Sequence, residues 1–351
     1  MRILGDVTVK NYLKNLSFQD LKLYQNKLSQ ALIAYHYDHS LIPQRIVTTT
    51  KYATHLFMPS VGETVGFKAL TGSKEGFKGI TVILNKENGV PIGLVNASTL
   101  TAFRTALTST LGLSKTFDDS IKIETPLNEN LICFGVGQQG EWHIRLSLIL
   151  YPKKFKKILI VNRSYENALK LINLLKDEFK DYEFEFIKSD DKSLIKSSFE
   201  NASVIYSCIP STEPTIYKEY IDNCKLSKIF IGTIGSYKPH MIEVEGKLMK
   251  ELILNKGGKV IVDSVEHCLE EAGEFIQNDI GEESLIEVSE LYMDESEQTA
   301  QAKSELEWIK SNDCKVVYSK AVGLAIMDMS IGEYLLTHAE NDNVGFVFDG
   351  F

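Results

Sequence analysis

The pattern of apolar and polar residues changes character along the chain. Near the N-terminus, apolar residues recur at helical spacing after a capping-box-like start at Ser17 and Asp20, which predicts an amphipathic helix to about Tyr37. Short apolar runs separated by turn residues then predict an antiparallel sheet, with strands at 46–50, 55–58, 64–70, 80–84 and 91–95. Another helix begins near Ser98.

From about Asn130 the pattern alternates between strands and helices. Strands are predicted at 131–134, 157–162, 183–188, 203–206, 228–231 and 259–262, and helices at 138–150, 164–179 and 246–256. This alternation is typical of a doubly wound α/β domain. A last, buried-looking helix at 322–338 could return to the first part of the chain. The predicted fold class is therefore α/β, with a Rossmann doubly wound domain (117–315) inserted in an α+β domain (1–116 plus 316–351).

A glycine motif stands at the start of the alternating region. The apolar run Leu131–Phe134 leads into Gly135-Val136-Gly137-Gln138-Gln139-Gly140, and a helical pattern follows. In a G-x-G-x-x-G turn the first glycine permits the tight bend, the second lets the backbone approach a pyrophosphate, and the third lets helix and strand pack closely. The pyrophosphate then lies on the helix N-terminus. The order predicts a dinucleotide site at Gly135, Gly137, Gln138 and Gln139, and a turn that only packs strand on helix is the alternative.

The end of the next strand favours one dinucleotide. NAD enzymes usually carry an acidic residue there to bind the ribose 2′-hydroxyl. This chain has Asn162, Arg163 and Ser164 instead, and Arg163 and Ser164 could hold a 2′-phosphate by charge and hydrogen bond. We therefore predict NADPH rather than NADH as the cofactor. The alternative is that Arg163 is a solvated surface residue.

Composition narrows the remaining possibilities. The 351 residues are 44% hydrophobic and carry a net charge of −9, so a nucleic-acid or anionic-membrane partner is not expected. The five cysteines form no CxxC pair, which suits reduced thiols in the cytosol and argues against a metal site or a disulfide framework. No secretory signal or membrane-length apolar run is evident, so a cytoplasmic location is expected.

Three cations outside the dinucleotide region are candidates for substrate chemistry. Lys68 lies in an apolar strand, where a buried charge needs a partner, although an edge position with the ammonium in water is the alternative. Arg104 shares a helix face with Thr101, and its planar guanidinium suits a carboxylate, although a structural ion pair is equally reasonable. With Arg45 at the start of the sheet, these cations favour an anionic substrate whose carboxylate faces the nicotinamide.

Several blocks of the sequence resemble the ornithine cyclodeaminase/μ-crystallin family. The blocks occur in the family's order, and they are Lys68, Gly93 to Ala106 (with T-A-F-R-T), Gly135 to Gln139, Ile234 to Pro239, Val262 to Ser264, Glu271 to Glu274, and Val322 to Asp328. The combination of the T-A-x-R-T and G-x-G-x-Q blocks is specific.

The resemblance implies a homodimer whose substrate-binding domains join through their β-structure, with a Rossmann domain in each subunit. It implies that Arg45, Lys68 and Arg104 look like residues that grip the substrate carboxylate or polarise its carbon–nitrogen centre, so Lys68 and Arg104 are assigned as catalytic. The further assignments are Met58, Thr81 and Thr101 to substrate binding, and Ser207 and Ile234 to cofactor binding.

One departure from the family bears on the reaction. Cyclodeaminases and related alanine dehydrogenases carry an aspartate two residues before the proline of the block ending at Pro239, and this chain has Tyr237 there. The first hypothesis is therefore an NADPH-dependent reductase of a cyclic imino acid (ketimine) or related imine. The alternatives are an ornithine cyclodeaminase or amino-acid dehydrogenase, in which Glu63 or Asp328 replaces the missing acid, and a non-catalytic NADPH-dependent binding protein. Asp328 is expected to cap or pair within the last helix.

Overall fold

The computed structural model describes residues 1–73, 76–117 and 127–350 and divides into two compact units. The first unit is discontinuous and consists of Met1–Leu107 and Gly323–Phe351, whereas the second unit is Thr108–Val322. Residues 108–116 and 316–322 were predicted to belong to the α+β domain, but they fall in the second unit. The roles predicted for the two parts, substrate binding and cofactor binding, remain predictions.

The first unit is built on a mixed sheet in the order β15-β1-β6-β5-β4-β3-β2. Its strands are β1 (Arg2–Leu4), β2 (Ile46–Thr49), β3 (Thr54–Val61), β4 (Val65–Ser73), β5 (Gly76–Leu84), β6 (Pro91–Asn96) and β15 (Phe346–Val347). Its helices are α1 (Asp6–Lys14), α2 (Phe18–Tyr37), the first part of α3 (Ala97–Thr116) and α12 (Ala325–Asn341), with a 3₁₀ turn at His39–Leu41. Strands β2 to β6 pair antiparallel, as predicted, whereas β1 pairs parallel with β6.

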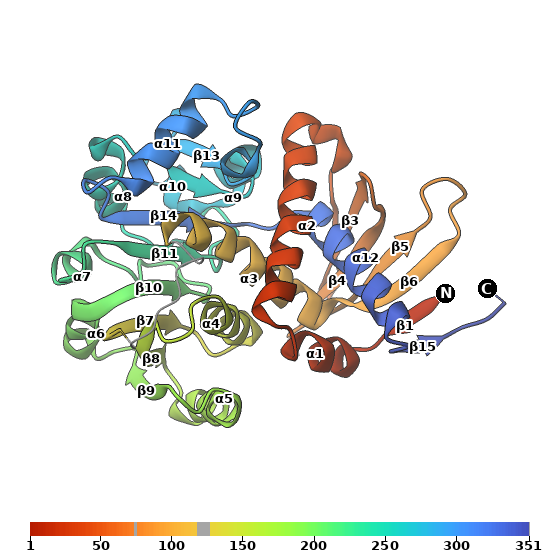
Figure 1. The fold of residues 1–351 in the computed structure, drawn as a ribbon, viewed down its shortest axis with the longest axis horizontal. Coiled ribbons are helices and arrows are strands. Elements are labelled where there is room, and N and C mark those ends of the chain that lie inside the picture. The colour runs from red at the N-terminus through yellow and green to blue at the C-terminus, as the bar shows by residue number, and fades with distance from the viewer. Residues whose placement is uncertain (74–75, 118–126, 351) are drawn as a thin grey trace. The chain divides into compact units, whose positions relative to one another are not determined.

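Helix α12 lies against strands β3 to β6 and beside α2 (Figure 1). Helix α2 begins with the predicted capping box, in which Ser17 Oγ accepts from the Asp20 N–H and the Asp20 carboxylate accepts from the Ser17 N–H. The side chains of a strand alternate between the two faces of its sheet. Lys68 and Gly66 are buried, while Phe67 between them is 37% exposed, so the sheet has a covered and an outer face.

The second unit is built on a parallel sheet in the order β13-β12-β14-β11-β10-β7-β8-β9. Its strands are β7 (Glu129–Phe134), β8 (Phe155–Asn162), β9 (Glu183–Lys188), β10 (Ala202–Ser207), β11 (Ile229–Thr233), β12 (Val260–Val262), β13 (Leu285–Glu287) and β14 (Val316–Lys320). Its helices are α4 (Gln138–Leu150), α5 (Tyr165–Glu178), α6 (Lys192–Ser198), α7 (Lys218–Asp222), α8 (Gly246–Leu252), α9 (Val265–Glu271), α10 (Gly273–Ile276) and α11 (Ala300–Lys310). Short 3₁₀ turns lie at Phe199–Asn201, Leu254–Lys256, Glu282–Ser284 and Glu290–Tyr292.

Both faces of this parallel sheet are covered. Adjacent residues of one strand, such as Ile132 and Cys133 of β7, point to opposite faces and are both fully buried. The same holds for Val317 and Tyr318 of β14. The predicted α/β fold with a Rossmann-type doubly wound sheet is confirmed.

Some elements differ from the sequence prediction. Strand β1, helix α1 and strand β15 were not predicted, and β14 pairs with β11 and β12 within the parallel sheet. The segment 279–313, for which no strand was predicted, contains the buried strand β13 and helix α11, of which Ala302, Glu305 and Ile309 are buried. No helix in the described part of the chain is long and apolar enough to cross a membrane.

Candidate active site

The glycine loop of the second unit joins β7 to α4. Gly135 follows β7 with φ of 108°, a conformation that favours glycine, and Gly137 is the N-cap of α4. A Cβ at Gly140 would lie 2.5 Å from the Gly135 carbonyl oxygen, so the third glycine lets the helix pack on the loop. A Cβ at Gly137 would meet nothing within 4 Å, which leaves open space beside the helix N-terminus. The loop therefore fits a pyrophosphate by its shape and by its place at the N-terminus of α4.

The other predicted cofactor residues follow strands that end at the same edge of the sheet. Strands β8 and β9 follow β7 on one side of it in the sheet, whereas β10 and β11 lie on its other side. The strand order therefore reverses between β7 and β10. Ligands of such sheets bind at the carboxyl ends of the strands at this reversal. Ser207 ends β10, and Ile234 follows β11 and donates its N–H to the Ser207 carbonyl at 3.1 Å. On the loop, the Gln139 side-chain oxygen is buried and has no hydrogen-bond partner among the described residues.

The tripeptide after β8 has a defined local structure. Asn162 donates its side-chain amide to the Ser164 carbonyl at 2.9 Å, and Ser164 Oγ caps α5 by accepting from the Asn167 N–H. Arg163 between them is exposed. The Ser164 hydroxyl also donates to Glu166 at 3.0 Å, so it is already engaged within the chain. Arg163 is therefore the member of the tripeptide with a charge directed to solvent.

A buried ionic cluster holds the loop after β11. Lys320 Nζ lies 3.2 Å from Glu243 Oε2 and 3.6 Å from Glu274 Oε1, and all three side chains are fully buried. Glu243 accepts the N–H groups of Gly235 and Ser236, at 2.7 and 2.8 Å. Burial raises the pKa of Glu243, against the charge of Lys320. Lys320 was not among the predicted site residues, although it lies in an apolar strand as Lys68 does.

In the first unit, three predicted residues form one row across the covered face of the sheet. Lys68 on β4 is directly opposite Met58 on β3 and Thr81 on β5. All three side chains are buried, and Lys68 is 1% exposed. Strand β4 lies inside the sheet, so the alternative of an edge position for Lys68 is wrong.

Asp328 of α12 connects Lys68 to Arg104. One carboxylate oxygen, Oδ1, accepts from Lys68 Nζ at 3.0 Å and from Arg104 Nε at 3.2 Å. Gly323, with φ of 93°, gives room to the guanidinium, because a Cβ there would lie 2.8 Å from it. The expectation that Asp328 pairs within its own helix is wrong, because its partners lie on β4 and α3. These three residues are called the Lys68–Asp328–Arg104 cluster below.

The cluster contains two cations and one anion. Burial lowers the pKa of Lys68 to about 8, although Asp328 acts in the opposite direction. Asp328 Oδ2 and Thr81 Oγ1 are buried without a hydrogen-bond partner in the described part of the chain. Buried polar groups are normally paired, so each of these two oxygens lacks the partner that such a group usually has.

The remaining predicted substrate residues lie farther along the same unit. Arg45 is half-buried and directly precedes β2, the outermost strand of the sheet and two strands away from β4. Thr101 lies one turn before Arg104 on α3, and its hydroxyl donates to the Ala97 carbonyl at 2.5 Å, within its own helix. The structure thus brings Met58, Thr81 and Arg104 together around Lys68 and Asp328, whereas Arg45 lies at the edge of the sheet.

A protein-family profile matches residues 21–343 and therefore spans both units. The chain belongs to the ornithine cyclodeaminase/mu-crystallin family. Within this family, the loop after β11 is the block in which the resemblance places an aspartate in cyclodeaminases. In this family member the position is Tyr237, which is 38% exposed and follows the fully buried Ser236.

Individual relatives agree with membership of the ornithine cyclodeaminase/mu-crystallin family. An uncharacterized protein of Saccharomyces cerevisiae is 29% identical over 369 residues, covering 95% of this chain and 96% of that protein. A Delta(1)-pyrroline-2-carboxylate reductase of Bacillus cereus is 26% identical over 303 residues, or 83% of each chain. The structure of an archaeal alanine dehydrogenase dimer with bound NAD aligns with a TM-score of 0.74 at 16% identity, over 100% of this chain and 99% of that one. The last similarity shows the shared fold.

Proposed function

We propose that the protein is an NADPH-dependent oxidoreductase that reduces the carbon–nitrogen double bond of a small cyclic imino acid. The observation that carries the proposal is the Lys68–Asp328–Arg104 cluster, with its buried cations and unsatisfied oxygens. The relative from Bacillus cereus, whose name states reduction of pyrroline-2-carboxylate, supports this substrate class.

The charges of the cluster suit a carboxylate-bearing imine. Two cations share one carboxylate oxygen, so the cluster has a net charge of +1 while Lys68 is protonated. An anionic substrate balances that charge, and the planar guanidinium of Arg104 suits its carboxylate. A Lys68 pKa of about 8 leaves the ammonium able to give a proton to the substrate nitrogen near neutral pH. A polarised imine carbon is then more susceptible to reduction.

The second unit is proposed to hold the cofactor. The pyrophosphate would bind beside Gly135 and Gly137, at the N-terminus of α4. The side-chain oxygen of Gln139, which has no partner among the described residues, would accept a hydrogen bond from the cofactor. A bound nicotinamide dinucleotide supplies the hydride. The absence of an acidic residue at Asn162, together with the exposed Arg163, favours the 2′-phosphate of NADPH.

We also propose a homodimer formed through the outer face of the first unit's sheet. On this face Ile46 is directly opposite Phe57, and Ala69 lies between Phe57 and Ile80 in the register. Ile46, Phe57 and Ile80 are 61%, 43% and 43% exposed. Phe67 and Ile92 lie on the same face and are 37% and 40% exposed. A continuous apolar surface of this kind marks a protein–protein interface. The dimer named for the archaeal alanine dehydrogenase supports this assignment.

The test is the consumption of NADPH by the purified protein with Delta(1)-pyrroline-2-carboxylate and its six-membered homologue, with NADH in parallel. We expect NADPH-dependent reduction, loss of turnover in Lys68→Met with NADPH binding retained, and weaker binding of NADPH but not of NADH in Arg163→Ala. Full turnover in Lys68→Met would overturn the role of the cluster. Bound NADPH without turnover on either imine would refute the substrate class.

A further inference from the structure

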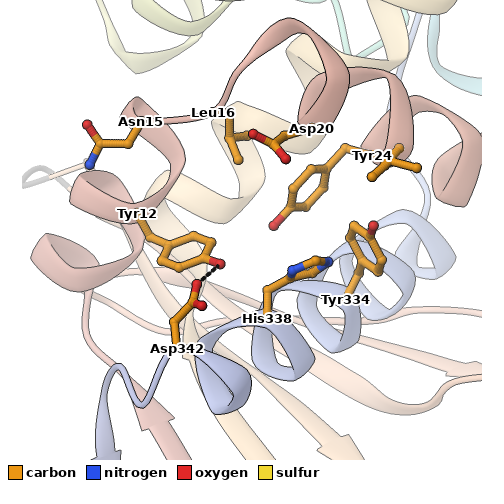
Figure 2. Close-up of a pocket in the computed structure, with 9 residues that line it drawn as sticks. Tyr12, Asn15, Leu16, Asp20, Tyr24, Tyr334, His338 and Asp342 are labelled. Atoms are coloured by element: carbon orange, nitrogen blue, oxygen red, sulfur yellow. Dashed lines mark hydrogen bonds between the residues drawn. The ribbon is translucent and has the colours of Figure 1, made fainter.

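A cavity in the first unit lies outside the Lys68–Asp328–Arg104 cluster. It has a volume of about 340 Å³ and is formed by residues of α1, α2 and α12 and their flanking loops (Figure 2). Its main lining side chains are Tyr12, Asp20, Tyr24, Tyr334, His338 and Asp342. We call it the tyrosine pocket.

The walls of the tyrosine pocket are aromatic. Tyr24 and Tyr334 meet edge to face with ring centroids 4.8 Å apart, and Tyr334 meets His338 in the same way at 4.4 Å. Figure 2 shows Tyr12 on the other side of the space from Tyr334. Aromatic faces attract cations through the negative charge density above the ring.

The polar lining of the pocket is acidic. Tyr12 donates its hydroxyl to Asp342 Oδ2 at 2.7 Å, and burial, this bond and the charges of Asp342 and Asp20 raise the pKa of Tyr12. Hydrogen bonds from Ser17 lower the pKa of Asp20, which keeps its carboxylate ionised. Nine residues line the pocket, and none of them is a lysine or arginine. Two carboxylates without a lining lysine or arginine repel anions and attract cations.

One buried hydroxyl lacks a partner at this place. Tyr24 is 2% exposed, and its hydroxyl has no hydrogen-bond partner among the described residues. In Figure 2 this hydroxyl points into the space between Tyr12 and His338. A buried polar atom without a partner is costly, and a ligand N–H group would satisfy it.

We propose that the tyrosine pocket binds a small organic cation, namely a primary ammonium group on a short apolar body. The N–H donors of an ammonium suit the carboxylate and hydroxyl oxygens of the lining, while the apolar body contacts the rings. A volume of about 340 Å³ is near the lower end of known small-molecule sites, so the ligand is small. Neither the glycine loop nor the Lys68–Asp328–Arg104 cluster is part of this site.

The experiment is a ligand-observed NMR titration of the full chain at low ionic strength. The probe is n-butylammonium, with butyrate and n-butanol as the anionic and neutral molecules of matching shape. We expect binding of the ammonium and none of butyrate at this site. Asp342→Asn, in which the new side chain can still accept the Tyr12 hydrogen bond, should weaken ammonium binding by about tenfold or more.

Tyr24→Phe provides an independent variant that removes only the unpartnered hydroxyl. It should weaken ammonium binding without lowering the midpoint of thermal unfolding. The matched controls are Asp313→Asn and Tyr52→Phe, which alter exposed residues far from the pocket in sequence and should bind the ammonium like the parent chain. Unchanged affinity in Asp342→Asn and Tyr24→Phe, or absence of ammonium binding by the parent chain, would overturn the proposal.

Discussion

The pKa of Lys68 permits a quantitative test of the buried cluster. Burial lowers this pKa from 10.5 to about 8, so the unfolded chain binds the proton more tightly than the folded one. Protonated Lys68 therefore opposes folding. At 1.36 kcal/mol for each pKa unit, the opposing contribution is about 3 kcal/mol well below pH 8.

The sign of the pH dependence follows from the same shift. Between the folded pKa of about 8 and the unfolded value of 10.5, the unfolded state holds more protons, so the stability due to Lys68 rises with pH. The free-energy cost of folding with Lys68 protonated falls by about 2 kcal/mol between roughly pH 7.5 and pH 9.5. Replacing Lys68 with methionine removes this dependence and keeps an unbranched side chain.

The assay is urea denaturation of the parent chain and of Lys68→Met at both pH values. The parent chain should gain about 2 kcal/mol relative to the variant as the pH rises, because titrations elsewhere affect both proteins equally. Lys170→Met, at an exposed position of α5, is the control and should show no such difference. If the difference in the free energy of unfolding between the parent chain and Lys68→Met is the same at both pH values, the conclusion that burial lowers the pKa of Lys68 is refuted.

Four further variants test other parts of the structure. Gly140→Ala should cost about 1–3 kcal/mol because of the contact with the Gly135 carbonyl, whereas Gly137→Ala should keep the melting temperature and weaken NADPH binding, as measured by thermal unfolding and fluorescence titration. Lys320→Met leaves two buried carboxylates without their counter-ion and should cost about 3–5 kcal/mol in urea denaturation; parent-like stability would contradict the ion pairing. Phe57→Glu, on the outer sheet face, should sediment as a monomer at concentrations where we expect the parent chain to form the proposed dimer.

Local patterns made the fold predictable where the signal is contained in a few adjacent residues. The strand–glycine–helix order around Gly135 predicted β7 and α4, and both are present. The antiparallel strands β2 to β6 were also recognisable from short apolar runs and turns. Strands β1 and β15 have three and two residues, which is too short for the alternation of apolar and polar residues that identifies a strand.

The ion pairs were not predictable from the sequence. Lys68 was recognisable as a cation in an apolar strand, but its partner Asp328 is 260 residues away. Helical periodicity indicates which face of α12 is buried, and it does not reveal which strand that face covers. The partners of Lys320 were unknown for the same reason. Glu243 lies in the loop before α8 and Glu274 lies in α10, and the sequence does not show that either residue reaches β14.

The separation of Lys68 and Asp328 along the chain also affects the order of folding during protein synthesis. The second unit is continuous and is complete before residue 328 leaves the ribosome, whereas the first unit must wait for α12 and β15. At about 5–20 residues per second, translation of the intervening 260 residues takes roughly 13–50 s. During this interval the nascent sheet lacks both its covering helix and the counter-ion of Lys68, so the apolar face that α12 later covers stays open to water or to a chaperone.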